Sequence, residues 1–270
     1  MESGFIQVPE GNLWFDTTGA GPDVVLIHPG LWDSRTWDET VVDLRDRYRV
    51  TRYDVRGYGR SSFPLTPYSN LEDLLAVLDH LGIERAAVVG CSMGGNIAIG
   101  FTIEHPDRVS CLVPVASGIS GWDWPEEKWA PVWSRIQESL DREDTDTATE
   151  IALEIWAPLG TTGRSGSTIK QIALENSQQF RLDEEELENS SPPSLERLAT
   201  ITAPTLVVLG KDDVEEITEI GEFIASRVPG ARQVFIDGAD HVVNMRQREV
   251  FANVVGGFLD EVFLSSQRTD

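Results

Sequence analysis

The stretch that decides the fold lies at residues 86–96 and reads AAVVGCSMGGN. Its first four residues are apolar and partly β-branched, which predicts a short buried strand over 86–89. Apolar residues recur over 93–105, and we expect a helix there. Between the two, residues 90–94 form the pattern Gly-x-Ser-x-Gly around Ser92. A serine placed this way between a strand and a helix is typical of a nucleophile elbow, a sharp turn that exposes the hydroxyl.

The glycines of this pattern have a steric explanation. A serine at such a turn has a strained backbone, so Gly90 and Gly94 beside it must be nearly free of side chain. Gly95 lets the following helix lie close to the sheet. The Ser92 hydroxyl would then project beyond the strand, near a helix N-terminus that favours negative charge. An ordinary glycine-rich turn is the alternative interpretation, and the partners of Ser92 described below argue against it.

Composition limits the class of protein and its partners. The chain has 270 residues, of which 40% are hydrophobic and 25% charged, as in globular proteins. The net charge of −23 argues against binding to nucleic acid or to an anionic membrane surface. No run approaches the roughly 20 apolar residues that span a bilayer, and residues 1–4 do not resemble a signal peptide. Two cysteines are too few for a disulfide framework, and we expect a cytoplasmic protein.

Strand-like and helix-like segments alternate along most of the chain. The continuous apolar run at 24–27 is typical of a strand buried on both faces of a sheet. The leucines of 71–81 have helical spacing. We expect strands at 4–8, 12–17, 24–27, 48–53, 86–89, 109–116, 205–209 and 233–236, and helices at 37–48, 71–81, 93–105, 214–227 and 247–264. This alternation predicts an α/β fold, with a mostly parallel sheet covered by helices on both faces.

One long segment, residues 118–200, interrupts the alternation, and we call it the insert. It contains five of the eight tryptophans, and its aromatic and aliphatic spacing predicts three or four short helices. We expect the insert to form a helical cap over the carboxyl ends of the strands, where ligand sites of such sheets lie. A surface excursion without contact to substrate is the alternative. Residues 1–117 and 201–270 would form the core domain, and the acidic run 183–186 a solvated face.

A serine hydroxyl is a weak nucleophile until a neighbouring base, usually a histidine, takes its proton. The chain has four histidines. His80 and His105 lie in or beside expected helices and are expected to be structural. His28 leads into the loop that is expected to supply an oxyanion donor, as described below. His241 follows a late strand, so it lies at the same edge of the sheet as Ser92. We therefore predict that His241 is the general base and acid.

An acid that fixes the tautomer of the histidine completes such a set. The strand expected at 205–209 leads into Gly-Lys-Asp-Asp, which puts Asp212 and Asp213 at the same edge as Ser92. Asp213 is preferred, because its spacing from the glycine brings a carboxylate behind the histidine in this architecture. Asp212 is the alternative, and the aspartate that is not used would cap the next helix.

An oxyanion that forms during acyl transfer needs backbone N–H donors. The N–H of Met93, directly after the predicted nucleophile, is one candidate. The loop after the strand at 24–27 supplies the other. Because Pro29 has no N–H, Gly30 is the best candidate there, with Leu31 behind it. A plain turn at this loop is the alternative.

These features together resemble the α/β-hydrolase family, over roughly residues 5–116 and 203–263. Besides the elbow, the matching motifs are Leu-Ile-His-Pro-Gly at 26–30, Asp-x-Arg-Gly-x-Gly-x-Ser at 54–61, His-Pro-Asp-Arg-Val at 105–109, Gly-x-x-Asp at 210–213 and the late His241. Within the family, the chain is similar to small capped esterases and lactonases such as 3-oxoadipate enol-lactonases. The resemblance implies eight strands, a cap between strands six and seven, and no cofactor.

We therefore predict a serine hydrolase that cleaves a small-molecule carboxylic ester or lactone through an acyl-enzyme. The same residues could instead hydrolyse a carbon–carbon bond in a diketone or carry out cofactor-free perhydrolysis. A ligand-binding relative without catalysis is a further alternative. No cluster of His, Cys and carboxylate residues has the spacing of metal ligands, and the sequence predicts no oligomeric state. The residues expected in the substrate pocket are Leu31, Trp32, Trp122, Trp124 and Trp156.

Overall fold

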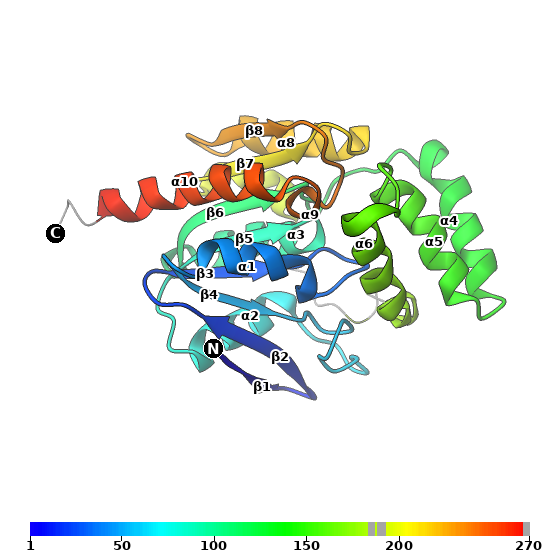
Figure 1. The fold of residues 1–270 in the computed structure, drawn as a ribbon, viewed down its shortest axis with the longest axis horizontal. Helices are drawn as coiled ribbons and strands as arrows, with labels where there is room; N and C mark the ends of the chain where they lie inside the picture. Colours follow the sequence, from blue (N-terminus) through cyan, green and yellow to red (C-terminus); the bar gives the residue numbers. More distant parts are fainter. Residues whose placement is uncertain (183–186, 188–192, 267–270) are drawn as a thin grey trace.

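The computed structural model describes residues 1–182, 187 and 193–266. These residues contain one eight-stranded sheet, in the order β1-β2-β4-β3-β5-β6-β7-β8 (Figure 1). β1 pairs antiparallel with β2 and β2 with β4, and every other neighbouring pair is parallel. The strands are β1 (Glu2–Val8), β2 (Gly11–Thr18), β3 (Asp23–Ile27), β4 (Arg49–Tyr53), β5 (Ala86–Cys91), β6 (Val109–Val115), β7 (Leu206–Gly210) and β8 (Arg232–Ile236).

Helices cover both faces of this sheet. α1 (Asp38–Leu44) and α10 (Arg248–Ser266) pack against each other on one face, and α2 (Asn70–His80) and α3 (Met93–Glu104) pack together on the other (Figure 1). α8 (Glu215–Arg227) packs on β7, and the short α9 (Val243–Arg246) precedes α10. All six residues of β5 are buried, as a central strand covered on both faces requires. The predicted α/β fold with a mostly parallel sheet is confirmed.

Three helices of the insert lie together beyond the end of the sheet: α4 (Glu126–Leu140), α5 (Thr145–Trp156) and α6 (Gly163–Glu175) (Figure 1). Their apolar side chains form a second buried cluster, which also contains Leu31, Trp32 and Val242 from loops of the sheet domain. The acidic run 183–186 lies outside the described residues. In the part of the chain that is described, each helix is too short or too polar to cross a lipid bilayer.

Among the expected elements outside the insert, the helix at 37–48 differs most from the structure. A 3-10 helix, Ser34–Trp37, leads into α1, which ends at Leu44. The N–H groups of Arg47 and Tyr48 both donate to the carbonyl of Leu44, at 3.0 and 3.1 Å, and this turn closes the helix before β4 begins. The other expected elements outside the insert have bounds within two residues of those observed.

The packing at the end of β5 explains the glycines around Ser92. A Cβ on Gly90 would lie closer than 3.0 Å to the backbone of Gly94. A Cβ on Gly94 would lie as close to the carbonyl oxygens of Ile27 and His28, at the end of β3. Backbone atoms of a central sheet cannot move aside for a methyl group, so α3 can begin here only without side chains at these positions.

We expect Gly94→Ala to lower the free energy of unfolding by about 3 kcal/mol or more, because the methyl group would force β3 and α3 apart. Gly257→Ala is the matched control. Gly257 lies on the exposed side of α10 with nothing within 4 Å of a built Cβ, so alanine should raise helix stability by about 0.5–1 kcal/mol. Thermal and urea unfolding measure both variants. A Gly94→Ala protein as stable as the wild type would contradict the proposed packing constraint.

Candidate active site

Ser92 lies on the turn between β5 and α3 with φ 52° and ψ −113°, a backbone conformation that residues with a side chain rarely adopt. Its N–H donates to the carbonyl of Val115 at 2.9 Å, which holds the turn against β6. Leu31 after β3 and Ala116 after β6 also have positive φ angles, 70° and 41°. Backbone strain of this kind persists only where the surrounding structure enforces it, and it collects at functional sites. The hydroxyl of Ser92 makes no hydrogen bond within the described residues.

His241 and Asp213 meet at the same edge of the sheet. His241 lies in the loop after β8 and is 1% exposed, and its Nδ1 lies 2.9 Å from Oδ2 of Asp213, in the loop after β7. An ionised carboxylate can only accept, so Nδ1 donates and Nε2 keeps a lone pair that can take a proton. The other oxygen of Asp213 accepts from the N–H of Val214 at 2.8 Å. Asp212, the alternative from the sequence, is exposed to solvent.

The two predicted oxyanion donors also lie together. A Cβ built on Gly30 would be 3.8 Å from Cβ of Met93, so the loop after β3 and the first residue of α3 are neighbours. The N–H groups of Gly30 and Met93 donate to no other group in the described part of the chain. Both residues border the same cavity as Ser92. Two free N–H groups beside a serine are the arrangement that can bind a developing oxyanion.

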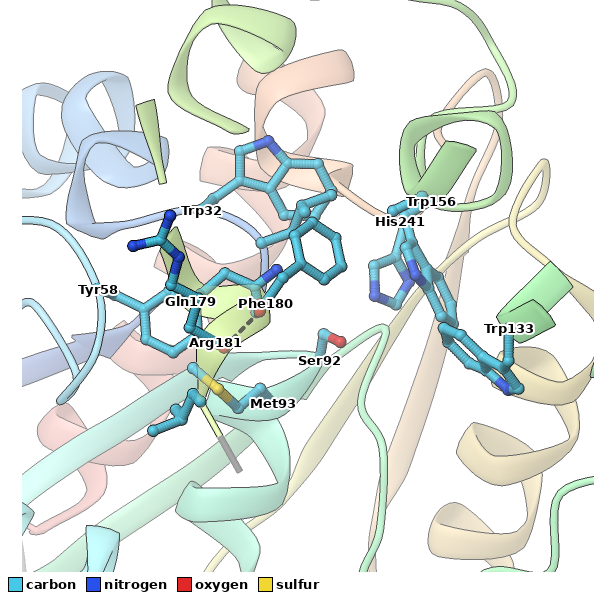
Figure 2. Close-up of a pocket in the computed structure, with 14 residues that line it drawn as sticks. Trp32, Tyr58, Ser92, Met93, Trp133, Trp156, Gln179, Phe180, Arg181 and His241 are labelled. Atoms are coloured by element: carbon cyan, nitrogen blue, oxygen red, sulfur yellow. Dashed lines mark hydrogen bonds between the residues drawn. The ribbon is translucent and has the colours of Figure 1, made fainter. Parts of the chain in front are cut away.

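A cavity of about 720 Å³ opens over these groups (Figure 2). Ser92, Met93 and Gly30 border it from the sheet domain, and His241 lies beside Trp156 of the insert. Of the five residues predicted for the pocket wall, Leu31, Trp32 and Trp156 line this cavity. The wall therefore combines the sheet domain and the insert.

Trp122 and Trp124 do not line the cavity, contrary to the sequence-based expectation. The ring of Trp122 packs edge-on against Phe223 of α8, with centroids 5.6 Å apart. Trp124 stands edge-on to Trp129 and Trp156, at 5.5 and 6.4 Å. Both side chains are thus used in packing within the insert and against α8, which spacing along the chain does not reveal.

Several lining residues were missed from the sequence. Tyr58 follows β4 in the glycine-containing loop, so its position at the carboxyl edge of the sheet could have indicated it. Its hydroxyl donates to Oε1 of Gln179 of the insert at 3.4 Å (Figure 2). The remaining members come from the insert and carry no sequence signal of their own. The missed residues are Tyr58, Trp133, Ala152, Gln179, Phe180, Arg181 and Leu182.

His28 is engaged in backbone contacts instead of catalysis. Its Nε2 accepts from the N–H of Val55 at 2.9 Å, and its Nδ1 lies 2.8 Å from the carbonyl oxygen of Pro29. Burial lowers the pKa of this imidazole, so it stays neutral and can accept the Val55 hydrogen bond. His28 thereby joins the ends of β3 and β4 beneath the loop that carries Gly30.

The two arginines of the loop after β4 form ion pairs with nearby aspartates. Arg56 forms a buried ion pair with Asp73 of α2, at 2.6 Å. Arg60 pairs with Asp54 at 3.1 Å and lies over the ring of Trp14. Both guanidinium groups therefore hold loop structure. Among the described residues, no three potential metal ligands lie close enough together to hold an ion.

The comparisons with known proteins agree with this geometry. A family model described as alpha/beta hydrolase fold matches residues 23–246. The chain is 28% identical to a 2-hydroxy-6-oxononadienedioate/2-hydroxy-6-oxononatrienedioate hydrolase of Cupriavidus pinatubonensis, over 95% of both chains. It is 29% identical to 3-oxoadipate enol-lactonase 1 of Acinetobacter baylyi, over 89% of this chain and 90% of that one. A solved thermophilic esterase from Thermogutta terrifontis superposes with a TM-score of 0.82 and 26% identity, over 97% and 99% of the two chains.

The cysteine beside the predicted nucleophile gives a test of the site. Cys91 and Cys111 are free and fully buried. Burial raises the pKa of Cys111 to about 12, and burial with the nearby charges of Asp213 and Asp240 raises that of Cys91 well above its usual value. Because the thiolate is the reactive form, we expect no reaction of the native protein with a disulfide reagent at pH 8, and two thiols after unfolding. Rapid reaction of one native thiol would contradict this.

Proposed function

The chain belongs to the alpha/beta hydrolase family, and on this premise we propose that it is a serine hydrolase of carboxylic esters or lactones. Ser92 is the nucleophile, His241 the general base and acid, and Asp213 the acid that orients the imidazole. The observation that carries the proposal is the 2.9 Å contact between His241 Nδ1 and Asp213 Oδ2, beside a cavity that Ser92 and His241 both line. The enol-lactonase and esterase among the similar proteins support ester chemistry.

The first half of the reaction forms an acyl-enzyme. Nε2 of His241 takes the hydroxyl proton as Oγ of Ser92 attacks the carbonyl carbon, and the carbonyl oxygen becomes an oxyanion. The carboxylate of Asp213 stabilises the imidazolium that results. His241 then gives the proton to the leaving oxygen as the ester bond breaks. An ester releases its alcohol at this step, whereas in a lactone the new hydroxyl stays on the acyl group.

The second half returns the enzyme to its starting state. A water molecule gives a proton to Nε2 of His241 and attacks the acyl carbon, which forms a second oxyanion. As this intermediate collapses, the proton passes from His241 to Oγ of Ser92 and the acid leaves. The N–H groups of Gly30 and Met93 stabilise both oxyanions, and one such donor is typically worth about 10²–10³ in kcat.

We propose that the insert, residues 118–200, acts as a cap that completes the substrate site. Trp133, Trp156 and Phe180 of the insert line the cavity above Ser92. A cavity of about 720 Å³ whose wall combines aromatic and aliphatic side chains with a few polar ones suits a small organic molecule. The proposed partner is therefore a small ester or lactone with an apolar part.

A second candidate reaction is hydrolysis of a carbon–carbon bond in a diketone. The Cupriavidus relative is named for a substrate with a 6-oxo group and no ester bond. The same three side chains could activate water or the serine toward a ketone carbonyl. A panel with aryl esters, lactones and a vinylogous diketone separates the two reactions, and we expect turnover of the esters or lactones.

The first test replaces the proposed nucleophile. Ser92→Ala should lower kcat toward an aryl ester by at least about 10⁴-fold and abolish labelling by a fluorophosphonate, because the proposed nucleophilic hydroxyl is removed. Ser226→Ala, at an exposed position on α8, is the control and should retain full activity. Peptide mapping of the labelled wild-type protein locates the adduct. An adduct on any residue other than Ser92 would refute the assignment.

The second test distinguishes the two adjacent aspartates. Asn at position 213 would keep the hydrogen bond from Val214 but turn an NH₂ donor toward His241, which would force the wrong tautomer. We therefore expect Asp213→Asn to lower kcat by about 10⁴-fold. Asp212→Asn changes an exposed neighbour and should stay within about threefold of the wild type. Equal losses in the two variants, measured with the same aryl ester, would show that the tautomer argument is wrong.

A further inference from the structure

Three tryptophan rings of the insert form a stack whose last member lies against the imidazole of His241. The Trp156 ring, at the end of α5, lies on His241 with centroids 4.6 Å apart and planes inclined by 38°. Trp129 of α4 also stacks on Trp156, at 5.7 Å and 13°. Trp133 stacks on Trp129 at 6.0 Å and 25°. One face of the imidazole is therefore covered by an aromatic side chain of the insert, beside the cavity (Figure 2).

The stack is attached to the helix that follows Asp213. Nε1 of Trp129 donates to Oε1 of Glu216 at 3.2 Å, and Nζ of Lys128 lies 2.6 Å from the same oxygen. Glu216 lies in the first turn of α8 and is 3% exposed. Burial alone would raise the pKa of Glu216, but the hydrogen bonds from Lys128 and Trp129 bring it below its usual value, so the group is a carboxylate. The segment 213–216 thus holds His241 from two directions, through Asp213 and through the tryptophans.

A second connection joins the insert to the residue before His241. The N–H of Leu159, three residues after Trp156, donates to Oδ2 of Asp240 at 3.2 Å. Arg246 pairs with Asp240 at 2.8 Å and also donates to the carbonyl of Gly160 at 2.8 Å. Asp240 is fully buried, and its carboxylate faces these partners. The end of α5 and the loop of His241 are therefore linked by backbone and side-chain contacts.

A histidine that serves as general base needs a fixed ring orientation. The bond from Nδ1 to Asp213 fixes one atom of the His241 ring, but the ring can still tilt about that bond. A second contact on the ring face removes this freedom. An aromatic face also attracts the positive charge that the imidazole acquires when it takes the serine proton. The contact with Trp156 supplies both effects at the step in which Ser92 loses its proton.

We propose that Trp156 is a positioning residue for His241, held in place by Trp129 and Glu216, through which the insert takes part in forming the catalytic base. This inference rests on the proposed function, because it assumes that His241 activates Ser92. It gives the insert a role beyond that of a pocket wall. It also implies that the effect of Trp156 is seen with reagents too small to fill the cavity.

The test uses the full chain and a small alkyl fluorophosphonate. In this reaction a bond forms between Oγ of Ser92 and phosphorus, fluoride leaves, and the hydroxyl proton goes to His241. We expect the second-order rate constant of labelling to fall about 10-fold in Trp156→Ala and to stay within about threefold of the wild type in Trp156→Phe, which keeps an aromatic face. Trp156→Leu keeps apolar volume without the aromatic face and should also lose about 10-fold.

Turnover of an aryl acetate gives a second readout. Because an acetyl group is much smaller than the cavity, the loss in Trp156→Leu should fall on kcat, with KM within about twofold of the wild type. Trp122→Leu is the matched control. Trp122 is another tryptophan of the insert, but it packs on Phe223 and does not border the cavity. The labelling rate of the Trp122→Leu protein should therefore match that of the wild type.

The outcomes separate the two proposals. Labelling of wild-type protein at a residue other than Ser92 would overturn the proposed function. Labelling at Ser92 with Trp156→Leu at the wild-type rate would leave that function standing and overturn the positioning role. Equal losses in Trp156→Phe and Trp156→Leu would also overturn it, since a mere packing defect would explain them. Circular dichroism and thermal unfolding identify a variant that has not folded. If Trp156→Ala and Trp156→Leu do not fold, the test rests on Trp156→Phe, and a fall in its kcat beyond about threefold would overturn the positioning role.

Discussion

The structure depends on close backbone packing between the first turn of α3 and the ends of β3 and β5. Backbone carbonyls of Ile27 and Gly94 occupy the positions that side chains at Gly94 and Gly90 would need. The chain can reverse from strand to helix within this space only if Ser92 adopts a positive φ of 52°. The same geometry leaves the serine hydroxyl at the edge of the sheet, so the packing constraint and the position of the proposed nucleophile have one cause.

The parallel arrangement of the sheet brings the other groups to this edge. Gly30, Asp213 and His241 follow β3, β7 and β8, and the carboxyl ends of these strands lie at the same edge of the sheet as that of β5. Loops from distant parts of the sequence therefore meet around Ser92 without any long excursion of the chain. The insert adds the aromatic wall and, through Trp156, a contact on the imidazole itself.

Much of the fold could be predicted from sequence, because buried parallel strands are continuous apolar runs and their order in the chain restricts the topology. Asp213 was preferred over Asp212 on spacing, and the structure places Asp213 against His241. The tryptophans of the insert were harder to assign. Trp122 faces α8, whereas Trp133 faces the cavity, and only the packing of one helix on another determines which face each presents. The composition of the insert indicated that it is rich in aromatic residues, but it did not determine which of these rings line the cavity.

A crystal structure of the chain after reaction with a phosphonate ester tests most directly whether these loops form one catalytic site. The proposed mechanism predicts phosphorus bonded to Oγ of Ser92, with the phosphoryl oxygen about 3 Å from the N–H groups of Gly30 and Met93. Nε2 of His241 should then lie within hydrogen-bonding distance of Oγ or of the remaining ester oxygen. A phosphoryl oxygen turned away from both N–H groups, or an imidazole directed out of the cavity, would contradict it.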